Sequence, residues 1–202
     1  QFDAIAATSG GRLVVSVHEA MAPCARPNMP KEVPVVNVLA TLRGTADPER
    51  VYVVGGHYDS RNGTGEDGKA AAPGAVDDAS GTAVALEACR VLSAYEFPAT
   101  IVFVAFDGEE QGLLGSAELA KKMVADGVRI DGMLGCDIVG NTLGMDGQRH
   151  DRHVRCFSYA ASGNDSLGRS LARAVAEAAR THVDGFVVKL ILRGDQIGRA
   201  HV

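Results

Sequence analysis

The sequence lacks several features that mark particular classes of protein. It has no run of about 18 consecutive apolar residues, so no transmembrane helix is expected. It has no low-complexity segment, no internal repeat and no interdomain linker, which is typical of an ordinary globular chain. Its basic residues are scattered and the net charge is −5, which argues against nucleic acid or an anionic membrane as a partner.

Cysteine is also sparse. The chain has four cysteines, and no two of them have the CxxC spacing of a redox or zinc motif. We interpret Cys24, Cys89, Cys136 and Cys156 mainly as small apolar residues of the interior, and a disulfide stays open at this point. With 202 residues, of which 46% are hydrophobic, the chain can build a sizeable core, and we expect one domain over residues 1–202.

The apolar runs predict an α/β fold. The Val-rich stretches 12–20 and 33–44 are predicted strands with no helix between them, so we expect them to form an antiparallel edge. The runs 51–60 and 100–106 are continuously apolar, which is typical of strands buried on both faces. Further strands are predicted at 132–140, 153–160 and 186–192. Helices are predicted from Asp78 or Ser80 to about residue 95, through 112–127, and over 164–182. This alternation after residue 50 predicts a mostly parallel sheet covered by helices.

The unusual residues of this chain follow the predicted strands. They are one histidine and six acids in four segments: His57, Asp59, Asp77, Asp78, Glu109, Glu110 and Asp137. Because open α/β sheets bind ligands beyond the carboxyl ends of their strands, we expect these side chains to meet at one rim.

Converging acids need a positive partner. Arg61 is the only basic residue near these strand ends, so a divalent metal ion fits better. Carboxylate and imidazole ligands together suit zinc and related ions. With several carboxylates and one histidine, two ions are more natural than one.

Four strings, GGHYDS, APGAVDDASG, AFDGEEQGLLGS and LGCDIVG, occur in this order. Together they resemble the zinc-dependent M28 family of metallopeptidases, whose best-known members are bacterial aminopeptidases. The resemblance covers roughly residues 33–194. It implies a three-layer zinc-exopeptidase-like sandwich, with helices on both faces of a mostly parallel sheet that has an antiparallel N-terminal edge.

The resemblance also implies a set of metal ligands. His57 and Asp137 would bind one zinc ion, Asp77 would bridge two, and Glu110 would bind the second. The peptide bond between Asp77 and Asp78 would be cis.

Two further roles follow from the same resemblance. Glu109 would be the general base, taking a proton from the attacking water and handing it to the leaving amine, and Asp59 would orient His57. The substrates would be peptides with a free amino terminus.

Plainer interpretations stay open for these residues. Glu109 and Glu110 are also typical of a solvated helix N-terminus. Asp78 is a good helix cap, Asp59 a good turn former, and His57 could be a strand-end histidine without a ligand. Alternative functions are an M20-like carboxypeptidase or deacylase, a single-zinc glutaminyl cyclase-like enzyme, and a receptor-like domain without metal.

The end of the chain departs from the family pattern. The family has a further histidine ligand in a Gly-Asp-His or Ser-Asp-His segment, whereas His201 follows Ala200 here. Residues 196–202, QIGRAHV, are what a widely used sequencing adapter encodes, so we expect them to be non-native and the chain to lack the C-terminal part of the catalytic domain. His150 and His153 are interpreted as part of a solvated loop. No export signal is visible, but the resemblance implies export, and the oligomeric state is not predicted.

Overall fold

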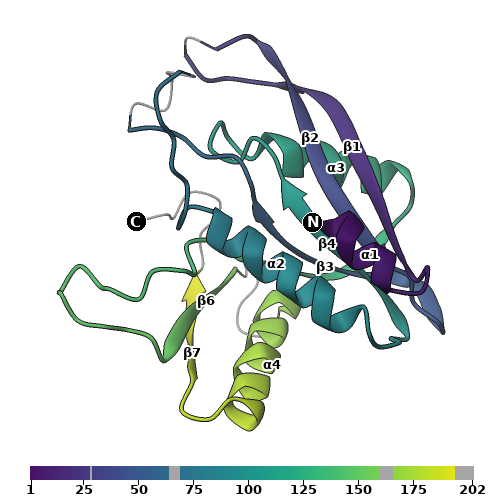
Figure 1. The fold of residues 1–202 in the computed structure, drawn as a ribbon, viewed down its shortest axis with the longest axis vertical. Coiled ribbons are helices and arrows are strands. Elements are labelled where there is room, and N and C mark those ends of the chain that lie inside the picture. The colour runs from purple at the N-terminus through teal and green to yellow at the C-terminus, as the bar shows by residue number, and fades with distance from the viewer. Residues whose placement is uncertain (28, 64–68, 160–165, 194–202) are drawn as a thin grey trace. The chain divides into compact units, whose positions relative to one another are not determined.

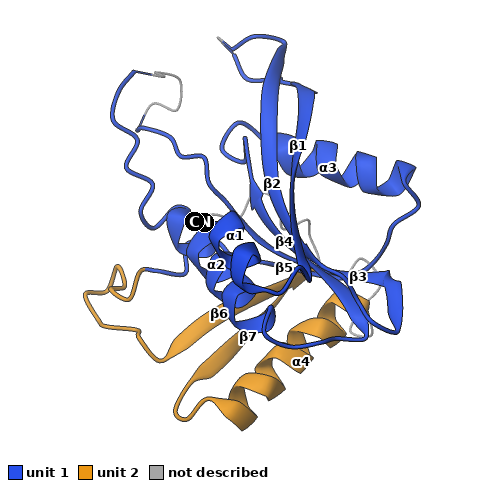
Figure 2. Cartoon of the chain, turned by 45° about the vertical axis from the view of Figure 1, so that its right-hand side comes forward, with its two compact units in different colours: residues 1–140 blue, residues 141–202 orange. Residues whose placement is uncertain are grey.

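The computed structural model describes residues 1–27, 29–63, 69–159 and 166–193. They belong to two compact units, residues 1–140 and residues 141–202, which Figure 2 shows in different colours. Each unit is described by itself below. The single catalytic domain expected over residues 1–202 stays a prediction.

Unit 1 holds three helices and five strands along the described chain (Figure 1). In chain order they are α1 (Phe2–Thr8), β1 (Leu13–Pro23), β2 (Glu32–Leu42), β3 (Asp47–His57), α2 (Ala79–Leu92), β4 (Ala99–Phe106), α3 (Leu114–Ala125) and β5 (Arg129–Gly135). All but α1 were predicted. The short α1 buries Phe2, but seven residues give too little periodicity to predict a helix.

The five strands form one sheet in the order β1-β2-β4-β3-β5. β1 pairs with β2, and β2 with β4, in antiparallel fashion, which confirms the antiparallel N-terminal edge. β3 is parallel to β4 on one side and to β5 on the other. The Val-rich composition of β2, β3 and β4 suits a sheet that is covered on both faces.

Alternate residues of β4 feed two cores on opposite faces of the sheet. Phe103 and Ala105 pack with Cys89 of α2, in a cluster that also includes Phe2 of α1. Val102, Val104 and Phe106 face the other way and pack with Leu119 of α3. Burying each large apolar side chain stabilises the fold by about 1.5–3 kcal/mol. Helices therefore cover both faces, α1 and α2 on one and α3 on the other, which confirms the three-layer sandwich (Figure 1).

α2 packs against the sheet through small residues rather than through its valines. Its buried residues are the small Gly81, Ala85 and Cys89, whereas Val84 and Val91 are each 42% exposed. Small residues on this face let the helix approach the sheet closely. At Gly56 in β3, a Cβ atom would lie only 2.5 Å from the carbonyl carbon of Gly81.

Unit 2 contains β6 (His153–Tyr159), α4 (Leu167–His182) and β7 (Val187–Arg193) among its described residues. β6 and β7 are parallel, so three of the five strand pairings in the described part of the chain are parallel. Ser166 caps α4 by accepting a hydrogen bond from the Arg169 N–H. None of the described helices is both long and apolar enough to cross a membrane.

Candidate metal centre

The carboxyl end of β3 is the point where the two parallel crossovers diverge. From β3 the chain passes through α2 to β4 on one side of β3, and then through α3 to β5 on its other side. Because parallel crossovers are right-handed, α2 and α3 cover opposite faces of the sheet. Ligands of open α/β sheets bind at such a switch point. His57, the last residue of β3, stands there.

His57 lies among four carboxylates. Its Nε2 atom is 3.1 Å from Asp77 Oδ1, 3.8 Å from Glu109 Oε2 and 4.0 Å from Asp137 Oδ1. On the other side of the ring, Nδ1 is 3.0 Å from the backbone oxygen of Asp59 and 3.4 Å from its carboxylate. The structure thus brings together, from three loops, side chains that the sequence predicted would meet.

The surrounding carboxylates raise the pKa of His57. The side chain is only 4% exposed, and burial by itself lowers its pKa. The hydrogen bond to Asp59 and the charges of Asp59, Glu109 and Asp78 outweigh burial and raise the pKa from 6.5 to about 9. Without a metal ion, the imidazole is therefore protonated at neutral pH.

Asp77 and Asp78 have different environments although they are neighbours. The peptide bond between them is cis, as the resemblance implied. Asp77 turns its carboxylate toward His57 and is 44% exposed, while Asp78 is fully buried. One residue therefore faces the site and the other supports it.

Asp78 joins the backbones that carry the other site residues. Its Oδ1 accepts hydrogen bonds from the N–H of Gly81 at 2.7 Å, which caps α2, and of Ile138 at 3.3 Å. Its Oδ2 accepts from the N–H of His57 at 3.1 Å. Burial raises its pKa above 3.8. The sequence predicted the cap, but the bonds to His57 and Ile138 depend on tertiary structure and were missed.

Asp59 fixes the loop that carries the two glutamates. Its Oδ1 accepts a hydrogen bond from the N–H of Glu109, and its Oδ2 accepts one from the N–H of Glu110, each at 3.1 Å. Burial by itself raises the pKa of Asp59, but the bonds from His57 and from these two N–H groups outweigh it and lower the pKa below 3.8. Asp59 therefore ties the ends of β3 and β4 together.

Asn37 and Asp107 hold the base of the same loop. Asn37 of β2 is fully buried, accepts a hydrogen bond from the Asp107 N–H at 3.1 Å and donates one to the Gly115 carbonyl at 2.9 Å. The Asp107 carboxylate accepts from the N–H of Val36 at 2.9 Å. Gly108 follows with a φ of +66°, a conformation that favours glycine. The turn that points Glu109 inward is thus anchored on β2.

Asp137 reaches the site from the segment after β5. The strand ends at Gly135, five residues before the predicted limit, and the N–H of Cys136 still bonds to the carbonyl of Gly55 at 2.8 Å. Ile138, the next residue, has a φ of +50°, and its N–H bonds to Asp78. This bend turns the Asp137 carboxylate toward His57.

The donors at this point fit a zinc ion. One ligand atom each from His57, Asp77 and Asp137 lies within 4.8 Å of the other two, and in the described part of the chain no other such group was found. His57 Nε2 is buried without a hydrogen-bond partner among the described residues, since its approach to Asp77 lacks hydrogen-bond geometry. An imidazole nitrogen with carboxylate oxygens is a donor set that zinc takes.

Glu110 stands apart from this group. Its Oε2 lies 3.1 Å from Nε of Arg61, the one basic residue that the sequence placed near the site. Burial and the charge of Asp77 raise the pKa of Glu110 above 4.5, while Arg61 opposes the rise. The structure therefore pairs the predicted second-ion ligand with a guanidinium.

In unit 1, the other described histidine, His18, does not join the site. His18 is within hydrogen-bonding distance of Asn37, with Nδ1 and Nδ2 3.0 Å apart. In unit 2, His150 lies 3.4 Å from an Asp146 oxygen, and its ring contacts that of His153 at 5.0 Å between centroids. His201 lies outside the described residues.

A family model described as peptidase family M28 matches residues 37–187, which is 151 of the 202 residues. The chain belongs to peptidase family M28. A "Probable zinc metalloprotease" from Leptosphaeria maculans is 42% identical over 210 residues, covering 96% of this chain and 48% of the relative. The chain spans less than half the length of the curated relatives it matches.

Solved structures of M28-like fold agree with the architecture. An aminopeptidase from Aneurinibacillus sp. strain AM-1 is 30% identical, with a TM-score of 0.57, over 81% of this chain and 35% of its own. A glutaminyl cyclase from an Acidobacteriales bacterium has a TM-score of 0.67 at 20% identity, over 96% of this chain and 62% of its own. The second likeness bears on the fold alone.

Proposed function

We propose that the protein is a zinc-dependent aminopeptidase that hydrolyses the first peptide bond of peptides with a free amino terminus. Its membership of family M28 and its likeness to an aminopeptidase at 30% identity support the reaction class. Curated relatives named as zinc metalloproteases support the metal. The observation that carries the proposal is the convergence of His57, Asp77 and Asp137 beside Glu109, at the carboxyl end of β3.

We assign the ligands as follows. His57, Asp77 and Asp137 would hold one zinc ion, and Glu110 together with Asp77 would hold a second. When bound, zinc supplies Lewis acidity, which lowers the pKa of water and polarises the carbonyl group of the scissile bond. The two ions would also offset much of the negative charge that these side chains bring together.

Glu109 is the general base in this proposal. Its side chain is 18% exposed, and Oε2 lies 3.8 Å from Nε2 of His57. A base placed there accepts a proton from the attacking water and then donates it to the leaving amine. Such proton transfer typically contributes about 10²–10⁴-fold in rate.

Asp59 is a positioning residue. Its backbone oxygen and carboxylate both lie beside His57 Nδ1, so the proton of the neutral ring sits on Nδ1 and Nε2 is left to bind metal. The same carboxylate holds the N–H groups of Glu109 and Glu110. Asp59 thereby fixes the positions of His57 and Glu109 relative to each other.

A substrate panel tests the proposal. The chain would be freed of metal, reloaded with zinc, and assayed on amino-acid anilides, N-acyl amino acids and peptides with N-terminal glutamine. We expect zinc-dependent hydrolysis of the anilides, which a chelator abolishes. Turnover of N-acyl amino acids alone would instead indicate an M20-like carboxypeptidase or deacylase.

A second candidate is a single-zinc enzyme of glutaminyl cyclase type. One observation favours it: the ligand group includes three residues, and Glu110 is paired with Arg61 outside it. Cyclisation of N-terminal glutamine with one bound zinc ion, and no release of amine from anilides, would favour this candidate over the aminopeptidase.

A further inference from the structure

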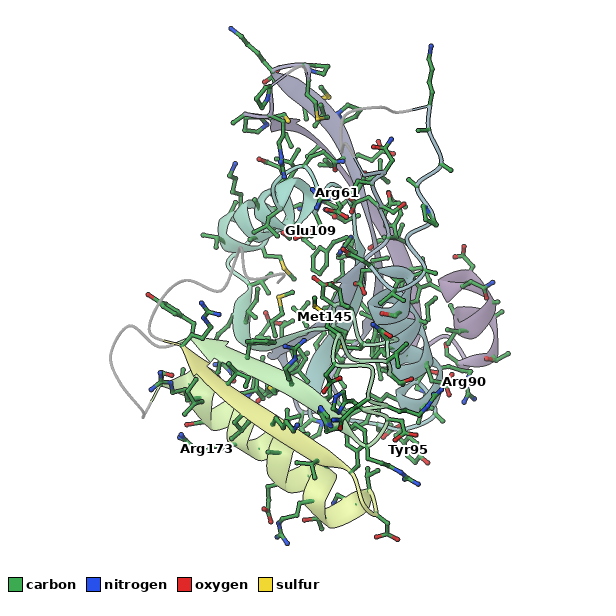
Figure 3. All side chains as sticks on the ribbon, turned by 90° about the vertical axis from the view of Figure 1, so that its left-hand side faces the viewer. Arg61, Arg90, Tyr95, Glu109, Met145 and Arg173 are labelled. Carbon is green, nitrogen blue, oxygen red and sulfur yellow. The ribbon has the colours of Figure 1, made fainter. Side chains whose placement is uncertain are left out.

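Arg61 contacts the site at the residue assigned to the second zinc ion. Its Nε lies 3.1 Å from Oε2 of Glu110, whose side chain is 10% exposed, while the Arg61 side chain is 52% exposed. Among the described residues, Glu110 is the one ion-pair partner recorded for Arg61. Figure 3 shows Arg61 and Glu109 in the same region of unit 1, well away from Arg90 and Tyr95 at the other end of α2.

A second arginine near Glu110 makes a different kind of contact. Nη2 of Arg26 donates a hydrogen bond to the backbone oxygen of Glu110 at 2.7 Å, and its Nε donates to that of Gln111 at 3.3 Å. Arg26 therefore stabilises the path of the loop, whereas Arg61 neutralises the carboxylate itself. The two positive charges have separable effects on Glu110.

We infer that Arg61 competes with the second zinc ion for Glu110 and so sets how many ions the centre holds. The inference rests on the proposed function, because it takes Glu110 as a zinc ligand. His57, Asp77 and Asp137 then bind the first ion without displacing any guanidinium. The second ion binds only as Arg61 leaves the Glu110 carboxylate, so it binds more weakly.

The sign of the effect follows from charge. A guanidinium beside Glu110 repels a divalent cation and occupies one of the oxygens that would bind it. A half-exposed ion pair is weak, and an arginine on a surface loop can swing into water without disturbing the core. The competition is therefore reversible, and it slows or weakens loading without blocking it.

Arg61 is thus a positioning residue that acts through Glu110 on metal stoichiometry.

The test is a zinc titration of the metal-free full chain, followed by calorimetry and by competition with a chromophoric chelator. We expect two binding steps, and we expect Arg61→Gln and Arg61→Ala to tighten the second step by about tenfold or more. Arg61→Lys keeps the charge and stays within about threefold of wild type in the second step. The matched control is Arg43→Gln, since Arg43 is an exposed arginine that follows β2 at the opposite end of the sheet.

A double variant tests whether Arg61 changes second-step zinc affinity through Glu110. If Arg61 acts through Glu110, Arg61→Gln changes nothing in a Glu110→Gln background. Added salt should also reduce the difference in second-step zinc affinity between wild type and Arg61→Gln, because salt screens the charge of an exposed arginine.

Three results would overturn the inference, and they differ in what else they overturn. An unchanged second step in Arg61→Gln, with a normal first step, overturns the competition alone. A weakened second step would mean that Arg61 orients Glu110 for binding, which is the opposite role. The absence of any zinc binding in wild type would overturn the proposed function together with the inference.

Discussion

The negative charge of the candidate centre is compensated differently in its two halves. On one side His57, Asp77 and Asp137 face one another within 4.8 Å, on segments that Asp78 links by buried hydrogen bonds. On the other side Glu110 has its charge met by Arg61, from a half-exposed loop. The first half is rigidly supported and rich in negative charge, while the second is neutralised by the protein itself.

The first half of the centre needs a metal ion more than the second half does. A buried group of acids around one histidine is stabilised when a cation joins it. A glutamate that already has a guanidinium gains less from a metal ion. We therefore expect the first half to bind zinc tightly and to dominate stability, and the second half to respond to small changes in charge.

The largest effect should come from removing the centre of the first half. His57→Ala deletes the only nitrogen ligand there, so we expect zinc binding in the first step to be lost and activity to fall by roughly a thousandfold. Zinc content after dialysis and initial rates on an amino-acid anilide measure both. His182→Ala, at an exposed position in α4, is the control. If His57→Ala retained its zinc, His57 would not be a ligand of the first ion.

The next effect separates chemistry from metal binding. Glu109→Gln keeps the shape of the side chain but cannot take up a proton, so we expect the rate to fall by about 10²–10⁴-fold. Zinc affinity should stay near that of wild type, because Glu109 is not a ligand. Rates are compared at equal zinc occupancy, with the exposed Glu87→Gln as control. Equal losses of rate and of zinc would make Glu109 a ligand instead.

A third variant weakens the support of the first half. In Asp78→Asn, an amide N–H₂ must face one of the backbone N–H groups of His57, Gly81 or Ile138. We expect first-step zinc affinity to fall by about 10–100-fold and the free energy of unfolding to fall by about 1–3 kcal/mol.

Urea unfolding and zinc titration check these two effects separately. Asp126→Asn, at the exposed end of α3, is the control. Loss of stability with unchanged zinc affinity would limit Asp78 to its role as a helix cap.

The last prediction needs no substitution and concerns the dependence on pH. The pKa of His57 is raised from 6.5 to about 9 in the metal-free chain, so its protonated form stabilises the fold fully below pH 6.5, and this contribution is lost as pH rises through 9. Zinc must displace that proton, so first-step affinity should rise about tenfold per pH unit up to about pH 9.

Calorimetry in buffers of different ionisation enthalpy counts the released proton. The midpoint temperature of thermal unfolding of the metal-free chain should decrease as the pH rises from 6.5 to 9, whereas that of the zinc-loaded chain should stay constant. The same pH profile with and without zinc would remove His57 from the site.

Much of this could be predicted from the sequence because the signals are local. Continuous apolar runs predicted β3 and β4, and the acids that follow them predicted which residues meet at the rim. The α/β architecture and the antiparallel edge followed from the order of strands and helices. Those features depend on residues near one another in the chain, or on rules of sheet topology.

The remainder depends on contacts between distant segments. The pairing of Arg61 with Glu110 and the bonds of Asp78 to His57 and Ile138 have no periodic signature in the sequence. The packing face of α2 has little signal in the sequence for another reason, because small residues such as Ala85 are weakly hydrophobic although they let the helix approach the sheet. Sequence patterns indicate which residues are unusual but not which backbone groups support them.

The zinc X-ray absorption spectrum of the chain loaded with one equivalent of zinc shows directly which side chains hold the first ion. We expect one imidazole nitrogen and carboxylate oxygens at about 2.0–2.2 Å, with no sulfur near 2.3 Å. The imidazole signal should disappear in His57→Ala. Sulfur ligation, or an imidazole signal that survives in His57→Ala, would show that zinc binds elsewhere and would contradict the account.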